Sequence, residues 1–570
     1  MVSSSITSHA HLSVSEIHLL SNKMPNCKLS RRRFLNRATL SASALATGTW
    51  FRLEIPARAQ GGHPGNPLRL PPDWAGEPLT VAQANLAIWP GFVTAVSAIN
   101  GSVPGPTIRV RRGDEFAARI ANQLAEPLVL HWHGVLAPEH EDGHPRDQVA
   151  AGNSYDVRFR VQQRAATCWY HAHTDQLTAE QAYRGVAGLF IIEDPAEVAL
   201  GLPTGDHDLP LVLTDKRTTA QRQLVYAPSM MDVMTGYLGD LVLVNGTPDA
   251  WLAVDRGLYR FRLLNGSNAR IYRVALSDGR PFHLVGMDGG LIPAPVSVSS
   301  VMLAPGQRLE ILVDFSSYPV GSALQLKSLS FTGGGGMMGG TQGVEMDLMR
   351  FYVDGAATGN ASQPSTLLPF TSYDSALARR TRVFTLASSG MVHTINGQLF
   401  SMSRVDFSVP FADLEIWEYR NTTSEFHPMH AHAAHCQILS RSSAAQLPPE
   451  DYGWKDTVLV KPNETVRILV RFDSHAGVFA HHCHNLEHED AGMMQNFEVL
   501  PAPTLSIRRG GDLITVSWPD SASGWLLEST LLMGEGEDWQ PVTQTPAKAD
   551  GKWSVTLPVA GRHQFFRLKK

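Results

Sequence analysis

Four short histidine clusters hold the residues best suited to metal chemistry in this chain of 570 residues. They are His131-Trp132-His133, His171-Ala172-His173, His427-Pro428-Met429-His430-Ala431-His432, and His482-Cys483-His484 with His488 and Met493 after it. Neutral imidazole binds copper, zinc, iron and nickel, so histidines alone do not select the metal. A thiolate and a thioether beside two histidines favour copper. The four clusters therefore predict copper binding.

The last cluster is expected to serve two metal sites. Successive side chains of a β-strand point to opposite faces, so His482 and His484 share one face and Cys483 takes the other. Because Cys483 is covalently bonded between the two histidines, the chain itself would connect the two sites. This is a physical reason for the order His-Cys-His.

The third cluster divides in the same way. His430 and His432 share a face, and His427, three positions earlier, takes the opposite one. One site can then collect His427, Cys483, His488 and, as a weak axial thioether, Met493. Two histidines and one cysteine are the ligand set of blue-copper electron-transfer sites. The other site can collect the eight histidines of the four His-x-His pairs.

Three copies of one β-rich unit are expected to position these clusters. Each copy starts at an Asn-Gly turn and continues into strands that alternate apolar and polar residues. The turns are Asn100-Gly101, Asn245-Gly246 and Asn396-Gly397. They are 145 and 151 residues apart, which is a domain-sized period, and boundaries are expected near residues 195 and 360. Residues 503–570 contain short strand patterns and predict a small C-terminal β-domain.

The phase of this repeat indicates where the clusters meet. His131 comes 31 residues after Asn100, and His427 comes 31 residues after Asn396. The matching position of the middle copy is Leu276. We therefore expect ligands from the first and third copies to meet at an interface between them, with the middle copy as a spacer.

The first 59 residues carry the features of an export signal. Arg31-Arg32-Arg33-Phe34-Leu35 is followed by a weakly apolar run over residues 38–50 and by Ala57-Arg58-Ala59, a small-residue cleavage pattern. The arrangement resembles a twin-arginine signal. It predicts the twin-arginine export machinery as a partner, cleavage near Ala59, and a periplasmic or otherwise exported protein.

Charge and hydropathy argue against two other classes of protein. The chain has 48 Lys and Arg against 53 Asp and Glu, a formal net charge of −5. Eight of the basic and two of the acidic residues lie in the first 59 positions, so the remainder is more acidic still. Its average field would repel nucleic acid. No stretch reaches the length of a membrane-spanning helix, so no membrane span is expected.

The motif set resembles the four copper motifs of the multicopper oxidases. These motifs are His131-Trp-His-Gly, Cys168-Trp-Tyr-His-Ala-His, His427-Pro-Met-His-Ala-His and His482-Cys-His-x3-His-x4-Met. The likeness spans roughly residues 75–500 and is closest to the bacterial copper-efflux cuprous oxidases and spore-coat laccases. It implies an all-β fold of three tandem Greek-key cupredoxin-like β-barrel or sandwich domains before the C-terminal β-domain. Their expected limits are 60–195, 196–360, 361–502 and 503–570.

The resemblance also implies four copper ions. The type 1 copper would be held by His427, Cys483, His488 and axial Met493, and the type 2 copper by His131 and His430. The two type 3 coppers would take His133, His171 and His484, and His173, His432 and His482. A small reducing substrate would give electrons one at a time to the type 1 copper, and dioxygen would be reduced to water at the other three.

Three carboxylates are implied in catalysis by the same resemblance. Asp142 and Glu489 are the expected proton donors to the oxygen site, because protons must reach it and a carboxylate is the usual carrier. Asp456 is expected beside a type 1 histidine at the substrate face. For Cys168 and Cys436, a disulfide and two buried thiols remain alternatives.

The expected activity is that of a laccase-like enzyme acting on phenols or aromatic amines. The rival is a cuprous oxidase active in copper tolerance. Such enzymes carry a long Met- and His-rich insertion, whereas residues 383–394 are short here and hold one Met, which weakens the case for a Cu(I) substrate. A third alternative is a non-catalytic cupredoxin scaffold, as in cell-division relatives that have lost their coppers, and retention of the complete ligand set argues against it.

Overall fold

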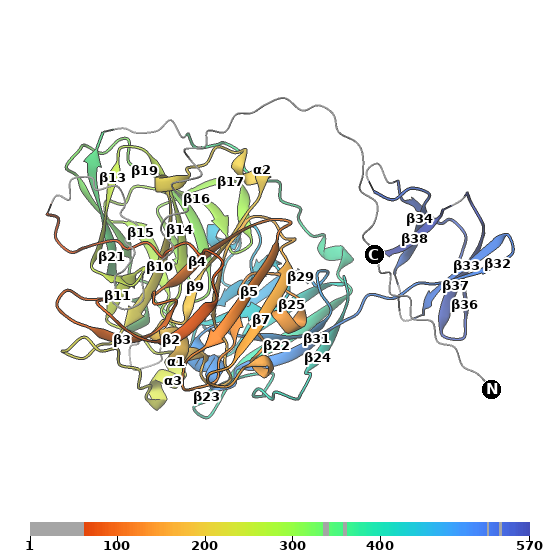
Figure 1. Ribbon diagram of the computed structural model, residues 1–570, viewed down its shortest axis with the longest axis horizontal. Helices are drawn as coiled ribbons and strands as arrows, with labels where there is room; N and C mark the ends of the chain where they lie inside the picture. The colour runs from red at the N-terminus through yellow and green to blue at the C-terminus, as the bar shows by residue number, and fades with distance from the viewer. Residues whose placement is uncertain are drawn as a thin grey trace, which may run out of the picture. The chain divides into compact units, whose positions relative to one another are not determined.

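Strands organised as four pairs of sheets make up the computed structural model of the chain (Figure 1). The structure describes residues 62–333, 341–356, 362–520, 522, 524–534, 538–561 and 563–570. The predicted export signal in residues 1–59 lies outside them. The prediction of an all-β architecture is confirmed. In the described part of the chain, no helix has the length and apolar character needed to cross a membrane.

The first pair of sheets carries two of the histidine clusters. One sheet has the order β3 (Thr94–Ile99), β2 (Leu79–Leu86), β5 (Glu115–Asn122), β7 (Ser154–Arg160). The other has the order β4 (Gly105–Arg111), β9 (Ala187–Glu193), β8 (Ala166–Ala172), β6 (Leu130–His131). Alternation along β5 buries Phe116, Ala118 and Ile120 in the core between them.

The second pair of sheets is the largest. One sheet has the order β1 (Asn66–Pro67), β13 (Ala250–Asp255), β21 (Met346–Gly355), β20 (Ala323–Ser328), β15 (Tyr272–Leu276), β18 (Ser300–Leu303). The other has the order β12 (Thr247–Pro248), β11 (Leu241–Val244), β10 (Asp208–Lys216), β14 (Leu258–Asn265), β19 (Arg308–Asp314), β16 (Phe282–Met287), β17 (Gly290–Val298). The N-terminal strand β1 thus joins this pair rather than the first.

The third pair carries the other two clusters. One sheet has the order β23 (Val392–Ile395), β22 (Arg380–Ser389), β25 (Leu414–Asn421), β29 (Thr465–Arg471), β27 (Cys436–Arg441). The other has the order β24 (Phe407–Pro410), β31 (Met494–Leu500), β30 (Gly477–Cys483), β26 (His427–Ala431), β28 (Thr457–Val460).

The C-terminal pair is small. Its sheets are β32 (Ser506–Gly510), β33 (Leu513–Pro519), β37 (Lys552–Pro558), β36 (Ala547–Ala549), and β35 (Gln540–Pro541), β34 (Leu526–Thr530), β38 (Phe565–Lys569). Val516, Trp518 and Leu527 belong to its own apolar core. The limits predicted for the four domains stay a prediction.

The three larger pairs repeat one connection. The first strand of each copy, β2, β10 or β22, pairs antiparallel with the next strand and parallel with a later one. Near that hairpin lie Asn100, Asn245 and Asn396, whose φ values are 50°, 50° and 53°. Because the following glycines also have positive φ, Asn-Gly suits these turns. The shared connection supports the repeat found in the sequence.

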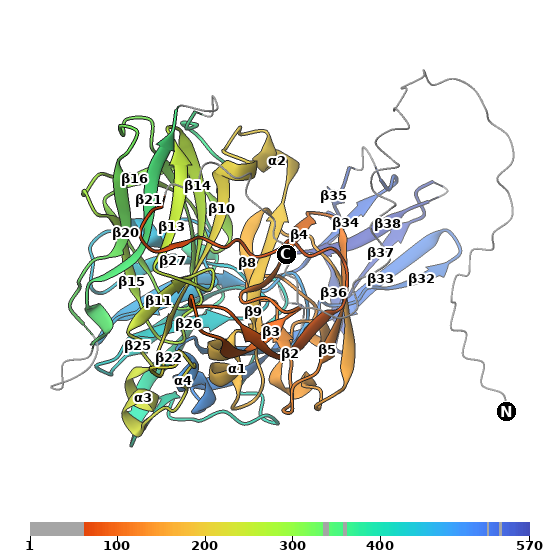
Figure 2. The same ribbon diagram turned by 60° about the vertical axis from the view of Figure 1, so that its left-hand side comes forward.

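Among the described residues, four short α-helices lie between the strands: α1 (Thr178–Arg184), α2 (Pro195–Val198), α3 (Met230–Thr235) and α4 (Leu486–Asp490). Helices α1 and α3 both contact α4, and the three lie at one end of the sheets (Figure 2). Ala179, Ala182 and Leu486 form an apolar cluster there. Segments from all three larger pairs therefore surround the helix that carries His488.

Candidate metal centre

The register of β26 on β30 places the side chains of both strands as alternation predicts. His430 pairs with His482, and Met429 pairs with Cys483. Cys483 and Met429 point into the apolar core of the third pair, whereas His430 and His482 contribute to a histidine cluster on the other face. Adjacent residues of β30 therefore serve different groups.

The first group contains Cys483 and two histidines, and all three are buried. The Cys483 Sγ atom lies 3.6 Å from His427 Nδ1 and 3.6 Å from His488 Nδ1. The other ring nitrogen of His427 is 2.9 Å from the Thr423 hydroxyl, and that of His488 donates to the Met234 carbonyl at 3.0 Å. These outer contacts hold each ring with Nδ1 toward the sulfur.

Met493 belongs to the same buried core. Its side chain is fully buried in the apolar cluster that contains Cys483. Its backbone carbonyl accepts a hydrogen bond from the Cys483 N–H at 3.1 Å. Met494, the next residue, begins β31. The contacts thus tie Met493 to the Cys483 group.

His393 is a third imidazole at this group, and the sequence did not point to it. It lies on β23, with its ring centre 4.4 Å from that of His488 and 4.8 Å from that of His427. Its Nε2 donates to the same Met234 carbonyl at 2.9 Å. An isolated histidine at the end of a strand carries no motif, so only the fold could reveal it.

The second group collects the eight histidines of the His-x-His pairs. Three sets have ring nitrogens within 4.8 Å of one another: His131, His430 and His432; His133, His171 and His484; and His173, His432 and His482. The nitrogens come within 3.4 Å between His131 and His430, and 3.3 Å between His173 and His482. These residues come from the first and third pairs of sheets, so the prediction of a shared interface is confirmed.

Hydrogen bonds leave one nitrogen of several rings free for a metal. The Nδ1 atoms of His131, His171 and His430 donate to backbone carbonyls at 2.7, 2.8 and 2.9 Å. Other buried ring nitrogens have no hydrogen-bond partner among the described residues: His133 Nδ1, His171 Nε2, His173 Nδ1, and both nitrogens of His484. Buried polar atoms without partners are costly, and metal coordination removes that cost. The donor set therefore fits metal ions.

Burial also keeps these imidazoles in the neutral form that metals bind. It is the main cause of the pKa of His171 falling to about 3. Burial likewise lowers the pKa well below the ordinary value for His131, His133, His173, His430, His432 and His484. Neighbouring imidazoles lower it further, because like charges would repel.

Asp142 and Glu489 adjoin the cluster. Asp142 Oδ2 accepts from His432 Nδ1 at 2.6 Å and lies 3.7 Å from His131 Nδ1. Glu489, on α4, has Oε2 2.9 Å from His482 Nδ1 and Oε1 3.6 Å from His173 Nε2. Burial raises the pKa of Asp142 well above its usual value. Both acids therefore lie in contact with histidines of this cluster.

Asp456 lies at the histidine cluster, so the expectation that it lies beside a type 1 histidine is wrong. Its Oδ1 is 3.1 Å from His133 Nε2, and its carbonyl accepts from His430 Nδ1. The cause is register, since β28 pairs with β26 so that Thr457, the next residue, faces His430. Burial opposes ionisation of this carboxyl, but the ion pair with Arg308 holds its pKa below the usual value.

Two of the cysteines that the structure describes lie outside the first group, and both are free. Cys168 and Cys436 are both buried thiols in the structure, and neither forms a disulfide. Cys168 donates to the Gly134 carbonyl at 3.3 Å. Burial raises the pKa of Cys168 to about 12, so it stays a thiol at neutral pH. Of the two alternatives, the buried thiols are correct.

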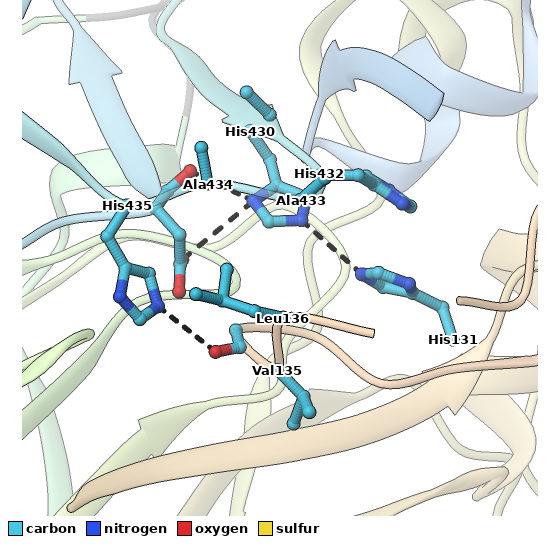
Figure 3. Close-up of a pocket in the computed structure, with 11 residues that line it drawn as sticks. His131, Val135, Leu136, His430, His432, Ala433, Ala434 and His435 are labelled. Atoms are coloured by element: carbon cyan, nitrogen blue, oxygen red, sulfur yellow. Dashed lines mark hydrogen bonds and ion pairs between the residues drawn. The ribbon is translucent and has the colours of Figure 1, made fainter. Parts of the chain in front are cut away.

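A small pocket lies at the edge of the histidine cluster (Figure 3). The rings of His131 and His430 face each other on one side of it. On the other side His435 turns away from the cluster and donates to the Gly134 carbonyl at 3.1 Å. Val135, Leu136, Ala433 and Ala434 complete its wall. The pocket therefore borders His131 and His430.

Comparison with known proteins agrees with this geometry. Residues 80–197, 216–322 and 373–503 each match the multicopper oxidase family. The cell division protein FtsP of Sodalis glossinidius is 34% identical over 83% of this chain and 99% of its own. Bilirubin oxidase of Albifimbria verrucaria is 34% identical over 71% of this chain and 73% of its own.

A solved structure of the same family is also similar. It is the laccase-like multicopper oxidase CueO of Ochrobactrum sp., described with oxidase activity towards lignin model compounds and lignosulfonate. It is 35% identical, covers 76% of this chain and 100% of its own, and superimposes with a TM-score of 0.69. The matched sheets, the copper-compatible histidine groups and these relatives lead to one conclusion. The chain belongs to the multicopper oxidases, copper-dependent oxidoreductases that use dioxygen as electron acceptor.

Proposed function

We propose that this multicopper oxidase is laccase-like, oxidising phenols or aromatic amines by one electron at a time while dioxygen is reduced to water. The observation that carries the proposal is the order His482-Cys483-His484, with the thiol in one group and the imidazoles in the other. Copper bound at the two groups supplies one-electron redox chemistry. The Cys483 backbone and side chain provide the shortest covalent path between them.

The proposed ligation follows the two groups. His427, Cys483 and His488, with Met493 as a weak axial contact, would hold a mononuclear copper. The eight-histidine cluster would hold three more, which makes four coppers per chain. Asp142 and Glu489 would hold protons beside His432 and His482, because four protons are consumed for each dioxygen.

The choice of phenols is tested by oxygen uptake. Copper-loaded protein is given 2,6-dimethoxyphenol or Cu(I) as the reductant, with and without added Cu(II). The proposal expects uptake with the phenol that does not require added copper. Turnover of Cu(I) alone, with no phenol oxidation even in excess copper, would overturn it. The laccase-like activity described for the Ochrobactrum relative supports this choice.

A cuprous oxidase is the second candidate, and one surface feature favours it. Helix α3 reaches His488 through the Met234 carbonyl, and Met230 and Met231 on that helix are exposed. Soft thioethers bind Cu(I). Replacement of both exposed methionines by leucine tests this candidate: Cu(I) oxidation should fall if these thioethers bind the substrate copper, and should be unchanged if they do not.

We also propose export through the twin-arginine machinery. The support is the Arg31-Arg32-Arg33 pattern with its apolar run and cleavage site. Replacement of Arg32 and Arg33 by lysine should leave the protein inside the cell, whereas the wild type should have a mature N-terminus near residue 60. An exported double variant would contradict this proposal.

A further inference from the structure

The second pair of sheets has no residue in the histidine cluster, yet it places a buried arginine beside it. Arg308 begins β19 and is fully buried. Its Nη1 donates to Asp456 Oδ1 at 2.8 Å, its Nη2 also pairs with Asp456, and its Nε donates to the Thr167 carbonyl at 2.9 Å. Thr167 lies on β8 of the first pair, and Asp456 precedes β28 of the third. The Arg308 guanidinium thus connects the first, second and third pairs of sheets.

We propose that Arg308 is a positioning residue for His133, acting through Asp456. The fork of the guanidinium holds both oxygens of the carboxylate, which fixes its plane. Asp456 Oδ1 then accepts from His133 Nε2 at 3.1 Å. The Nδ1 atom of that ring is left buried and without a hydrogen-bond partner among the described residues. The inference rests on the proposed ligation, in which this nitrogen binds copper.

A second ion pair fixes Arg308 in turn. Asp288 Oδ1 accepts from the Arg308 backbone N–H at 2.8 Å, and its Oδ2 lies 2.9 Å from Lys455 Nζ. Arg308, Asp288 and Lys455 are all buried, as is Asp456. The two cations, Arg308 and Lys455, balance the charges of the two carboxylates, and each carboxylate has a fixed cationic partner. A buried set of this kind has few alternative arrangements.

Two glycines show how closely this arginine packs on the proposed ligands. Gly134 follows His133, and a Cβ added there would lie 2.5 Å from Arg308 Nη2 and 2.8 Å from Asp456 Oδ2. Gly306 precedes Arg308 by two positions, and a Cβ there would lie 2.9 Å from the His484 ring. The glycine of His-Trp-His-Gly therefore makes room for the ion pair. The turn that leads into Arg308 contacts a second histidine of the same set.

The test compares Arg308 with a buried arginine of the same sheet. Arg260, on β14, is buried and pairs with Glu310 and Glu197. Arg308→Met and Arg260→Met both remove a buried charge, so both should lower the Tm of the metal-free protein. Only Arg308→Met should weaken copper binding at the histidine cluster, by about 10- to 100-fold, because supporting residues of a metal site have effects of that size. Copper per chain is measured against a competing chelator, and the blue colour of the Cys483 group should persist.

Two more variants make the result decisive. Arg308→Lys keeps the charge but loses the fork, so it should fold well and bind copper with intermediate affinity. If Arg308 acts through Asp456, Arg308→Met added to Asp456→Asn should weaken copper binding no further than Asp456→Asn alone. Wild-type copper affinity in both Arg308 variants, or an equal loss in Arg260→Met, would overturn the inference. A wild-type protein that binds no copper at the cluster would instead overturn the proposed ligation.

Discussion

The Cys483 group and the histidine cluster differ in what surrounds them. The outer ring nitrogens of His427 and His488 meet a hydroxyl and a backbone carbonyl. Those of His133, His432 and His482 meet carboxylates. Under the proposed function, the Cys483 group only passes electrons and needs no protons, whereas oxygen reduction at the histidine cluster consumes them. The chain therefore places its acids at one centre and neutral partners at the other.

The largest expected effect comes from breaking the link between the two groups. Cys483→Ser should abolish the blue colour and the oxidase activity, because it removes the thiolate while leaving the eight histidines intact. Copper content, visible absorbance and oxygen uptake measure the outcome. Cys436→Ser, another buried thiol of the third pair, is the matched control and should retain all three properties. Undiminished turnover in Cys483→Ser would refute the proposed path.

Without metal, the stability of the protein should depend strongly on pH, because so many imidazoles are buried together. Burial holds their pKa values below that of an exposed histidine, so below about pH 6.5 the unfolded chain binds protons that the folded chain does not. Stability is then retained above this pH and lost as the pH falls, by about 1.4 kcal/mol per histidine per pH unit. Thermal unfolding of metal-free protein between pH 7 and pH 5 measures it. A Tm independent of pH would contradict the burial of neutral rings.

Asp142→Ala should affect one centre and spare the other. Loss of a general acid typically slows a reaction by about 10²- to 10⁴-fold, so oxygen reduction should slow in that range. Reduction of the Cys483 group without oxygen, followed by stopped flow, should keep its wild-type rate. Asp156→Ala, which removes an exposed acid of β7 in the same pair of sheets, is the control. Slower anaerobic reduction of the Cys483 group would contradict the proposed role of Asp142 in oxygen reduction.

Met493→Leu should have the smallest effect. A thioether at the axial position tunes the redox potential of a blue-copper site without carrying the electron path. The blue colour should remain, and the potential and the substrate rate should change modestly. Met494→Leu tests the adjacent methionine and should leave the potential unchanged. A shift in the second variant and none in the first would reverse the assignment.

The sequence predicted the two groups because their geometry is local. Alternation along a strand decides the direction of His482, Cys483 and His484, and the Asn-Gly repeat indicates which copies carry ligands. The position of Asp456 depends instead on the register between β28 and β26, which no local pattern encodes. Register also explains why Asp456 was expected at the wrong centre.

The middle copy contributes more to the two centres than its sequence indicates. A missing histidine pair suggested a spacer, yet the second pair of sheets supplies Arg308 to one centre and the Met234 carbonyl to the other. These contacts use an arginine within a strand and a backbone atom, and neither leaves a motif. Their partners are 148 and 254 residues away in the chain, so only the folded structure could reveal them.

The pairing of β26 with β30 limits how this protein can evolve. Inserting or deleting a single residue within Gly477–Cys483 would exchange the two faces of the strand, turning the sulfur toward the histidine cluster and an imidazole into the apolar core. Both functions would then be lost in one event. Point substitutions can change either centre separately, but a change in the length of this strand alters both centres at once.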